Sequence, residues 1–126
     1  MAVLVISDED KILLVEGFRR GWEFPGGYVD RRESIYIAAK REVKEESGIE
    51  IDALKILGVE HYIDRSTTVV ILRGKAIGGK LTISNENSNV GYFSFEESRT
   101  MMKLKNFKER LVRCFDDAEF PFFIER

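Results

Sequence analysis

The chain has 126 residues and a formal net charge of -2, and 44% of its residues are hydrophobic. This length suits one domain with a buried core over residues 1–126, and the charge argues against a nucleic acid polymer as partner, which would need a basic face. The lone cysteine, Cys114, excludes an internal disulfide and no apolar run is long enough to span a bilayer, so we expect a cytoplasmic protein that does not bind membranes.

The N-terminal part of the chain predicts two strands and then a basic loop. The apolar runs Ala2–Ile6 and Lys11–Val15 are joined by a polar turn that predicts a hairpin. Arg19 and Arg20 follow in a loop, and then Trp22. Guanidinium groups pair well with phosphates and an aromatic ring can stack on a nucleobase, so we expect substrate contacts here. The alternative is a solvated loop followed by a core tryptophan.

A glycine turn and a helix come next. Gly26 and Gly27 follow a proline and predict a tight turn where backbone can approach a ligand, and we include Tyr28, directly after it, among the substrate contacts. Ser34 is a suitable N-cap for the helix, and Gly48 a suitable end.

The predicted helix carries acids on its inward face. Glu42, Glu45 and Glu46 are spaced i, i+3 and i+4 and therefore share one side of the helix. An amphipathic helix usually places its acids opposite its apolar stripe. Here most apolar positions fall in the acidic sector, with one at its border, and the lysines and Ser47 lie opposite; the apolar positions are Ile35, Ala38, Ala39 and Val43.

These carboxylates predict a metal site. Three close and partly buried negative charges repel one another and are poorly solvated, so they need a cation. A hard divalent ion with oxygen ligands fits best, and we expect Mg²⁺, with Mn²⁺ as a substitute, on Glu42, Glu45 and Glu46. Arg41 lies beside the acids, where an ion pair with a glutamate such as Glu33 would orient it in a supporting role.

The stretch from Gly27 to Ile49 resembles the Nudix box, G-x5-E-x7-R-E-U-x-E-E-x-G-U with U aliphatic, at every fixed position. With residue frequencies of roughly 5–7% each, chance agreement is on the order of 10⁻¹⁰ per starting point. The resemblance implies an α/β/α sandwich in which the box forms a loop, a helix and a loop. It also implies that the carbonyl of Gly26 contacts the metal, and that the substrate is a nucleoside diphosphate linked to another group and is cut within its pyrophosphate.

Three further strands are predicted in the middle of the chain. Leu54–Ile63 and Thr67–Ile77 are rich in β-formers, and the second is apolar on both faces, which favours a central position in the sheet. Gly78-Gly79 suits a two-residue hairpin turn into a third strand, Lys80–Ser84.

A polar loop at residues 84–89 precedes another predicted strand, Val90–Ser94. MutT-like members of the Nudix family often carry an acidic residue in this loop, a few residues before an aromatic on that strand. Glu86, six residues before Tyr92, is the matching position, so the resemblance implies that Glu86 is a further metal ligand. The alternative is an exposed loop acid.

The C-terminal part predicts a short helix, Glu96–Met102, and a second helix in which Leu104 and Phe115 are the first and last of a set of apolar residues at helical spacing. The apolar tail Phe120–Ile124 either docks on the domain or meets another subunit, so monomer and homodimer both stay open. The element order predicts the α/β (α+β) class, with a mixed sheet between helices. This agrees with the Nudix sandwich.

The expected chemistry is metal-assisted hydrolysis of a phosphoanhydride in a small nucleotide. Carboxylate-held Mg²⁺ neutralises phosphate charge and lowers the pKa of a bound water. Glu42 or Glu45 accepts the water's proton, directly or through the metal shell, so we group them as catalytic residues with the supporting Arg41.

The nucleotide stays open. Family members that prefer ADP-ribose often have a proline about sixteen residues past the box, where this chain has Arg65. The small size and Glu86 favour a MutT-like nucleoside triphosphate pyrophosphohydrolase, with ADP-ribose or another nucleotide sugar as the alternative. A non-catalytic nucleotide-sensing Nudix domain would be expected to lose a box glutamate, and none is lost.

Overall fold

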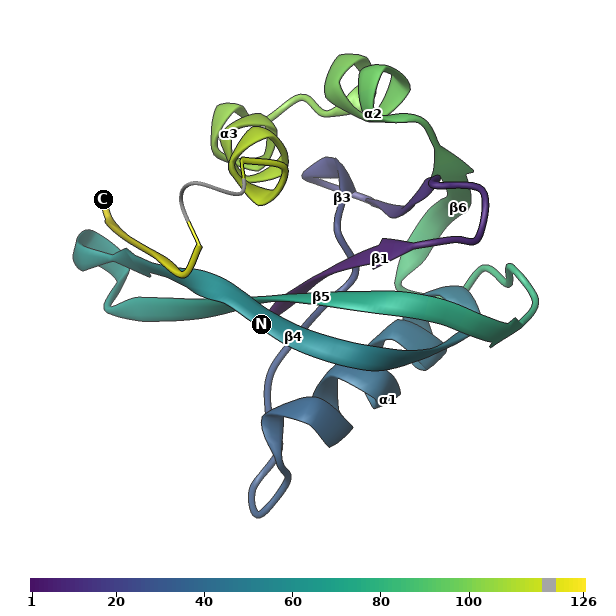
Figure 1. The fold of residues 1–126 in the computed structure, drawn as a ribbon, viewed down its shortest axis with the longest axis horizontal. Coiled ribbons are helices and arrows are strands. Elements are labelled where there is room, and N and C mark those ends of the chain that lie inside the picture. Colours follow the sequence, from purple (N-terminus) through teal and green to yellow (C-terminus); the bar gives the residue numbers. More distant parts are fainter. Residues whose placement is uncertain (117–119) are drawn as a thin grey trace.

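The structure is a computed structural model that describes residues 1–116 and 120–126. Seven strands form one mixed sheet: β1 Ala2–Ile6, β2 Ile12–Gly17, β3 Gly21–Glu23, β4 Ile49–Tyr62, β5 Thr67–Gly79, β6 Asn87–Phe93 and β7 Phe122–Glu125. The strand order is β3-β2-β1-β5-β4-β7, and β6 pairs with β2 off this path (Figure 1). The central position predicted for β5 is confirmed.

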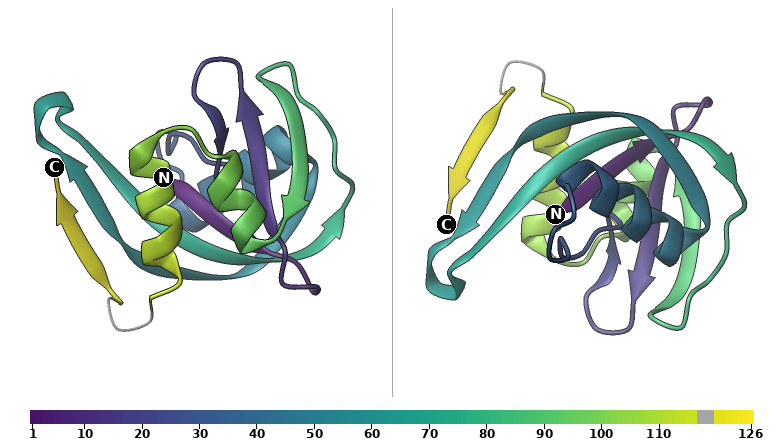
Figure 2. Two further views of the ribbon diagram at one scale, coloured as in Figure 1. Left: turned by 90° about the horizontal axis from the view of Figure 1, so that it is seen from above. Right: turned by 90° about the horizontal axis from the view of Figure 1, so that it is seen from below.

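Helices cover both faces of this sheet. α1 (Ile35–Ser47) packs on one face, and α2 (Phe95–Met101) and α3 (Lys105–Cys114) lie over the other (Figures 1 and 2). Side chains alternate across β1, so Leu4 joins the core under α3 and Val3 joins the core over α1. The predicted α/β sandwich is confirmed. None of the helices in the part of the chain that the structure describes is long and apolar enough to cross a membrane.

The caps predicted for α1 are present. The Ser34 hydroxyl accepts a hydrogen bond from the Ile37 amide, and Gly48 ends the helix at a φ of 80° with its N–H donating to the Lys44 carbonyl. The predicted outward position of Ser47 is wrong, because its hydroxyl donates to the Val43 carbonyl at 2.6 Å and is therefore satisfied inside the core. The predicted inward position of Ile35 is also wrong, since this first residue of the helix is exposed.

The strand predicted at Lys80–Ser84 is absent. These residues form a loop, and the Thr82 amide donates instead to the carbonyl of Ser47 at the end of α1. A strand returning antiparallel along β5 would have to lie where β1 already pairs, since β1 is parallel to β5 from Ile71 to Lys75. Conversely, the short strand β3, which follows the predicted basic loop, contains Trp22 and pairs with β2, was not predicted.

The apolar tail Phe120–Ile124 docks on the domain, which was one of the two predicted alternatives. Within it, β7 runs parallel to β4, with Phe122 opposite Gly58. A Cβ at Gly58 would lie 2.3 Å from Cδ1 of Phe122, so only glycine leaves room for that ring. Residues 117–119 lie outside the described part of the chain.

A buried ion pair joins β4 to α3. Both oxygens of Glu60 accept from Arg110, with the shortest distance 2.9 Å, and Arg113 and the Tyr62 hydroxyl also donate to this carboxylate at 3.2 and 2.8 Å. Burial opposes ionisation of Glu60, but the hydrogen bonds and charge of Arg110 outweigh it and lower the pKa of the carboxyl. The end of the sheet under α3 is therefore fixed by charge as well as by apolar packing.

Candidate active site

Most of the predicted site residues line one cleft of about 650 Å³ between α1, the loop after β2, the glycine turn and the loop before β6. Its lining is Gly17, Phe18, Arg19, Arg20, Glu23, Gly26, Gly27, Tyr28, Glu42, Glu45, Glu46, Glu86 and Asn87. The cleft thus brings together acids that suit a cation and two arginines that suit phosphate. Of the predicted substrate contacts, Trp22 alone does not line it.

Glu46 is hydrogen-bonded to the glycine turn and has a strongly raised pKa. Its Oε1 accepts a hydrogen bond from the Gly26 amide at 2.8 Å, which ties the helix to the glycine turn. Burial, followed by the charges of Glu42, Glu23 and Glu86, nevertheless raises the pKa of Glu46 to about 7. Burial likewise raises the pKa of Glu42, although Arg41 opposes it. The cleft therefore concentrates more negative charge than its own cations neutralise.

Arg41 organises these acids without lining the cleft. Its guanidinium meets Glu33 at 2.7 Å, Glu42 at 3.0 Å and Glu45 at 3.3 Å, so the predicted Arg41–Glu33 ion pair is present. It also donates to the Tyr28 carbonyl at 3.1 Å. The hydrogen bond from Arg41 lowers the pKa of Glu33 to about 2. One side chain thus links the loop before α1 to two of the predicted metal ligands.

The glycine turn lies close to the Glu42 carboxylate. A Cβ at Gly27 would lie 2.5 Å from the carboxyl carbon of Glu42, closer than real contacts allow. A larger residue at position 27 would therefore displace the Glu42 carboxylate from its present position. Glu45, by contrast, keeps 58% of its side chain exposed and faces open cleft.

The loop that carries Glu86 is anchored by its neighbour, Asn87. The buried Asn87 amide donates to the carbonyl of Glu46 at 2.7 Å and to the Ser84 hydroxyl at 3.1 Å. The exposed Glu86 is thereby held at the cleft, and its charge contributes to the raised pKa of Glu42 and of Glu46. Asn87 was not singled out from the sequence, although an asparagine at the end of a polar loop often bonds nearby backbone.

The donor set fits a hard divalent cation in its chemistry. Among the described residues, no three His, Cys, Asp or Glu side chains already stand in a ligand arrangement, because Arg41 engages Glu42 and Glu45 and the Gly26 amide engages Glu46. Four of the cleft's carboxylates, together with the Gly26 carbonyl, are nevertheless the kind of oxygen ligands that Mg²⁺ takes; they belong to Glu42, Glu45, Glu46 and Glu86.

Aromatic residues at the cleft differ from the prediction. Trp22 packs edge-to-face on Phe93, with ring centroids 5.1 Å apart, beside the core. Phe18 and Tyr28 line the cleft instead, with 70% and 86% of their surfaces exposed. The substrate contact of Trp22 stays a prediction that this packing does not favour. Phe18 could have been suspected as an aromatic beside the arginine pair.

Comparison with known proteins decides the family. The model of the NUDIX domain matches residues 1–115. The chain belongs to the Nudix family. It is a Nudix hydrolase, acting on phosphoanhydride bonds.

Several relatives of this Nudix hydrolase carry functional names. A MutT-like protein of Streptomyces ambofaciens is 28% identical over 94% of this chain and 77% of its own length. An ADP-ribose pyrophosphatase of Methanocaldococcus jannaschii is 29% identical over 88% of this chain and 69% of its own length. The crystal structure of an ADP-ribose pyrophosphatase from Streptococcus suis superimposes with a TM-score of 0.73, at 27% identity, over 99% of this chain and 97% of that one.

Replacing Asn87 by alanine tests whether it positions the Glu86 loop of this Nudix hydrolase. We expect a loss of stability of about 1–2 kcal/mol, because the partly buried carbonyl of Glu46 loses its donor, and a fall in kcat of about tenfold, because the loop is no longer held. Hydrogen exchange of residues 80–86 should accelerate. Asn85→Ala, an exposed change in the same loop, is the control and should alter neither quantity. Unchanged exchange in Asn87→Ala would remove the positioning role.

Proposed function

We propose that this Nudix hydrolase cleaves nucleoside triphosphates within the triphosphate chain, releasing a nucleoside monophosphate and pyrophosphate in a Mg²⁺-dependent reaction. The observation that carries the proposal is the meeting, in one cleft, of four carboxylates on α1 and the loop before β6 with Arg19 and Arg20 opposite. Carboxylates suit the metal and guanidinium groups suit the phosphates. The exposed rings of Phe18 and Tyr28 supply surfaces on which a base can stack.

The roles of the residues follow from their positions. Glu46, Glu42 and Glu45 would hold Mg²⁺, with Glu86 and the Gly26 carbonyl as further ligands. When bound, the ion neutralises phosphate charge and acidifies a water. Arg19 and Arg20 bind the phosphate oxygens and hold the substrate in line.

We assign Glu45 as the acceptor of the attacking water's proton, at its exposed carboxylate oxygens. Glu42 is pressed against Gly27 and is less open to water, whereas Glu45 faces the cleft. Arg41 keeps both carboxylates oriented through its hydrogen bonds. This choice between Glu42 and Glu45 was open from the sequence.

A nucleotide sugar such as ADP-ribose is the second candidate. A further hollow of about 450 Å³ adjoins the cleft, with which it shares Arg20, Glu23 and Tyr28 among other residues. It extends to Tyr62 and Arg65, whose guanidinium lies 4.6 Å from the Tyr62 ring centre. That hollow gives room for a second sugar. The two relatives named for ADP-ribose also favour this candidate.

A nucleotide panel with product analysis separates the candidates. Purified protein would be incubated with nucleoside triphosphates, ADP-ribose and other nucleotide sugars in Mg²⁺, and the products identified by chromatography. We expect monophosphate and pyrophosphate from triphosphates, and complete loss of turnover in excess EDTA while circular dichroism and Tm stay largely unchanged. Faster turnover of ADP-ribose would select the second candidate. Full activity in EDTA, or binding without any turnover, would overturn the proposal.

A further inference from the structure

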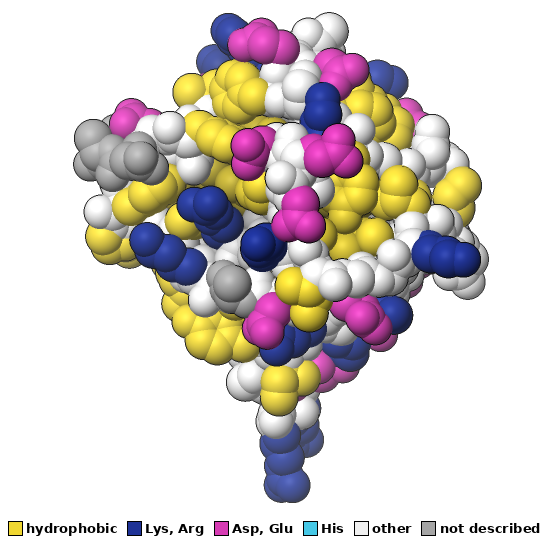
Figure 3. All heavy atoms as spheres, turned by 45° about the vertical axis from the view of Figure 1, so that its right-hand side comes forward, with side chains coloured by type: hydrophobic (Ala, Val, Ile, Leu, Met, Phe, Trp, Pro, Cys, Tyr) yellow, Lys and Arg dark blue, Asp and Glu magenta, His cyan; other side chains and the backbone are white. Residues whose placement is uncertain are grey.

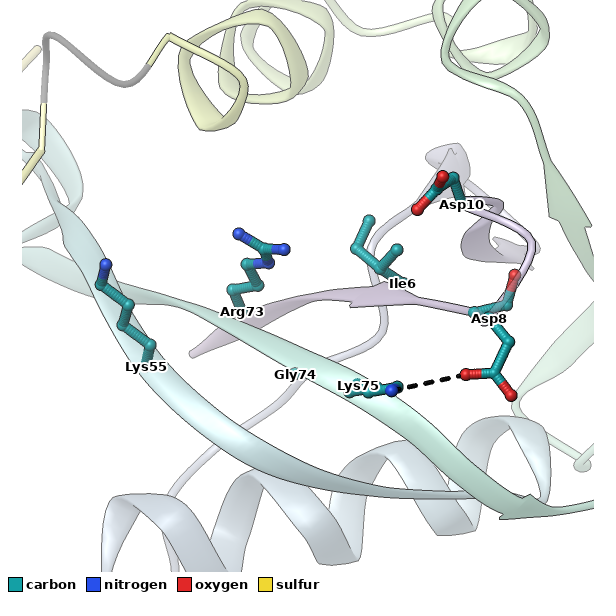
Figure 4. A pocket seen from close by; sticks show the side chains of 8 residues that line it. Ile6, Asp8, Asp10, Lys55, Arg73, Gly74 and Lys75 are labelled. Atoms are coloured by element: carbon teal, nitrogen blue, oxygen red, sulfur yellow. Dashed lines mark ion pairs between the residues drawn. The ribbon is translucent and has the colours of Figure 1, made fainter.

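A separate hollow, distinct from the cleft and from the hollow that adjoins it, lies on the side of the sheet opposite α1. No residue of α2 or α3 lines it. It has a volume of about 380 Å³ and is lined by Ile6, Ser7, Asp8, Asp10, Lys55, Arg73, Gly74 and Lys75 (Figure 4). It shares no lining residue with the active-site cleft or with the hollow that adjoins that cleft. Its volume lies within the usual range for small-ligand pockets.

Two cationic side chains stand side by side on its floor. Lys55 on β4 and Arg73 on β5 are directly opposite each other in the antiparallel pairing, and both side chains point away from α1 (Figure 4). Within residues 1–116 and 120–126, neither side chain forms an ion pair or a hydrogen bond. Like charges at opposed positions of a sheet destabilise it. An anion bound between Lys55 and Arg73 would offset this repulsion.

Lys75 and Ser7 add hydrogen-bond donors to the hollow, and Asp8 adds a negative charge. Lys75, two residues beyond Arg73, pairs with Asp8 at 3.5 Å, and both side chains are largely exposed, so this ion pair is weak and can yield. The Ser7 hydroxyl accepts from the amides of Glu9 and Lys11, which leaves its own hydrogen free to donate. Figure 3 shows Lys and Arg side chains gathered on this part of the surface, with Asp and Glu side chains beside them.

We propose that this hollow binds a small phosphoryl-bearing anion through Lys55 and Arg73, at a site separate from the active-site cleft. The Arg73 guanidinium offers paired N–H groups to phosphate oxygens, and Lys55 adds a point charge from the neighbouring strand. Asp8 and Asp10 at the rim, and the net charge of -2, disfavour an extended polyanion. The site therefore suits a compact anion rather than a nucleic acid.

The test measures binding of inorganic pyrophosphate by calorimetry in EDTA and low salt. Without a divalent ion, the carboxylates of the active-site cleft repel this probe. We expect the double variant Lys55→Gln/Arg73→Gln to bind it at least about tenfold more weakly than wild type. The control is Arg99→Gln/Lys108→Gln, which removes the same charge from exposed positions on α2 and α3 and should bind as wild type does.

Each other outcome overturns the proposal. Equal weakening in the control would show a general charge effect. Loss of binding in Arg19→Gln/Arg20→Gln, with Lys55→Gln/Arg73→Gln unaffected, would place the anion in the active-site cleft. No binding of pyrophosphate, inorganic phosphate or AMP up to about 10 mM would show that the hollow holds no such ligand.

If binding is found, the ranking of these three probes tells whether free phosphate, pyrophosphate or a nucleotide supplies the phosphoryl group. This test involves no hydrolysis, so it stands apart from the proposed function.

Discussion

Glu46→Gln should lower kcat on the order of 10³-fold while leaving the fold intact. The substitution removes one negative charge at nearly constant volume. A glutamine oxygen can still accept the 2.8 Å hydrogen bond from the Gly26 amide, so the glycine turn keeps its position. The loss then reflects the charge alone. Glu9→Gln, the same change at an exposed glutamate in the β1–β2 turn, is the control and should keep wild-type kcat.

The stability of Glu46→Gln adds a second readout, with a definite sign. The pKa of Glu46 is raised from 4.5 to about 7, so the folded protein holds this proton more tightly than the unfolded chain. The ionised carboxylate therefore reduces stability as pH rises from 4.5 through 7, and the amide removes that effect. Without metal, the variant should have a Tm equal to or above wild type at pH 8, and the difference should shrink below pH 4.5. Near-normal turnover, or inactivity explained by unfolding, would contradict the assignment.

Arg110→Met should destabilise the protein by about 3–5 kcal/mol. The Glu60 side chain is 1% exposed, so removing Arg110 leaves a buried carboxylate that Arg113 and Tyr62 only partly satisfy. Replacing both partners, as in Glu60→Leu/Arg110→Met, should recover much of this loss because no unpaired charge stays buried. Urea unfolding of the single and double variants gives the coupling energy. Additive losses would show that the pair does not act as a unit.

The pH dependence of the same pair follows from the lowered pKa of Glu60. Its stabilising contribution is present above 4.5, the ordinary value for glutamate, and is lost as pH falls through the lower value in the folded protein. The stability difference between wild type and Arg110→Met should therefore narrow on acidification. A difference that stays constant down to acid pH would show that Arg110 contributes through packing alone.

Local signals made α1 predictable. Ser34 and Gly48 mark its ends by backbone chemistry that involves only near neighbours, and the spacing of the box glutamates places them on one side. The outward position predicted for Ser47 was wrong because its hydroxyl is hydrogen-bonded within the helix itself, which its polarity alone does not reveal.

Pairing between strands far apart in the chain was harder to predict from the sequence. The parallel alignment of β1 with β5 joins segments far apart in the chain, and nothing local shows that it excludes a strand at Lys80–Ser84. At the site, local signals pointed to Phe18 and Asn87, but nothing local shows that Asn87 contacts the carbonyl of Glu46, 41 residues away in the chain. The three-residue strand β3 is too short to show a period-2 pattern in the sequence. Because side chains alternate along a strand, Trp22 nevertheless packs on Phe93, and Phe18 and Tyr28 are the aromatic residues that line the cleft.

The segment before α1, residues 27–34, has neither helix nor strand to order it. Arg41 supplies that order by contacting the Tyr28 carbonyl, Asp30 and Glu33 at once. The conformational entropy of this segment is therefore lost when the chain folds and not when a nucleotide arrives. A substrate that meets an already rigid rim spends less of its binding energy on ordering protein, and more of that energy remains available for the reacting phosphates.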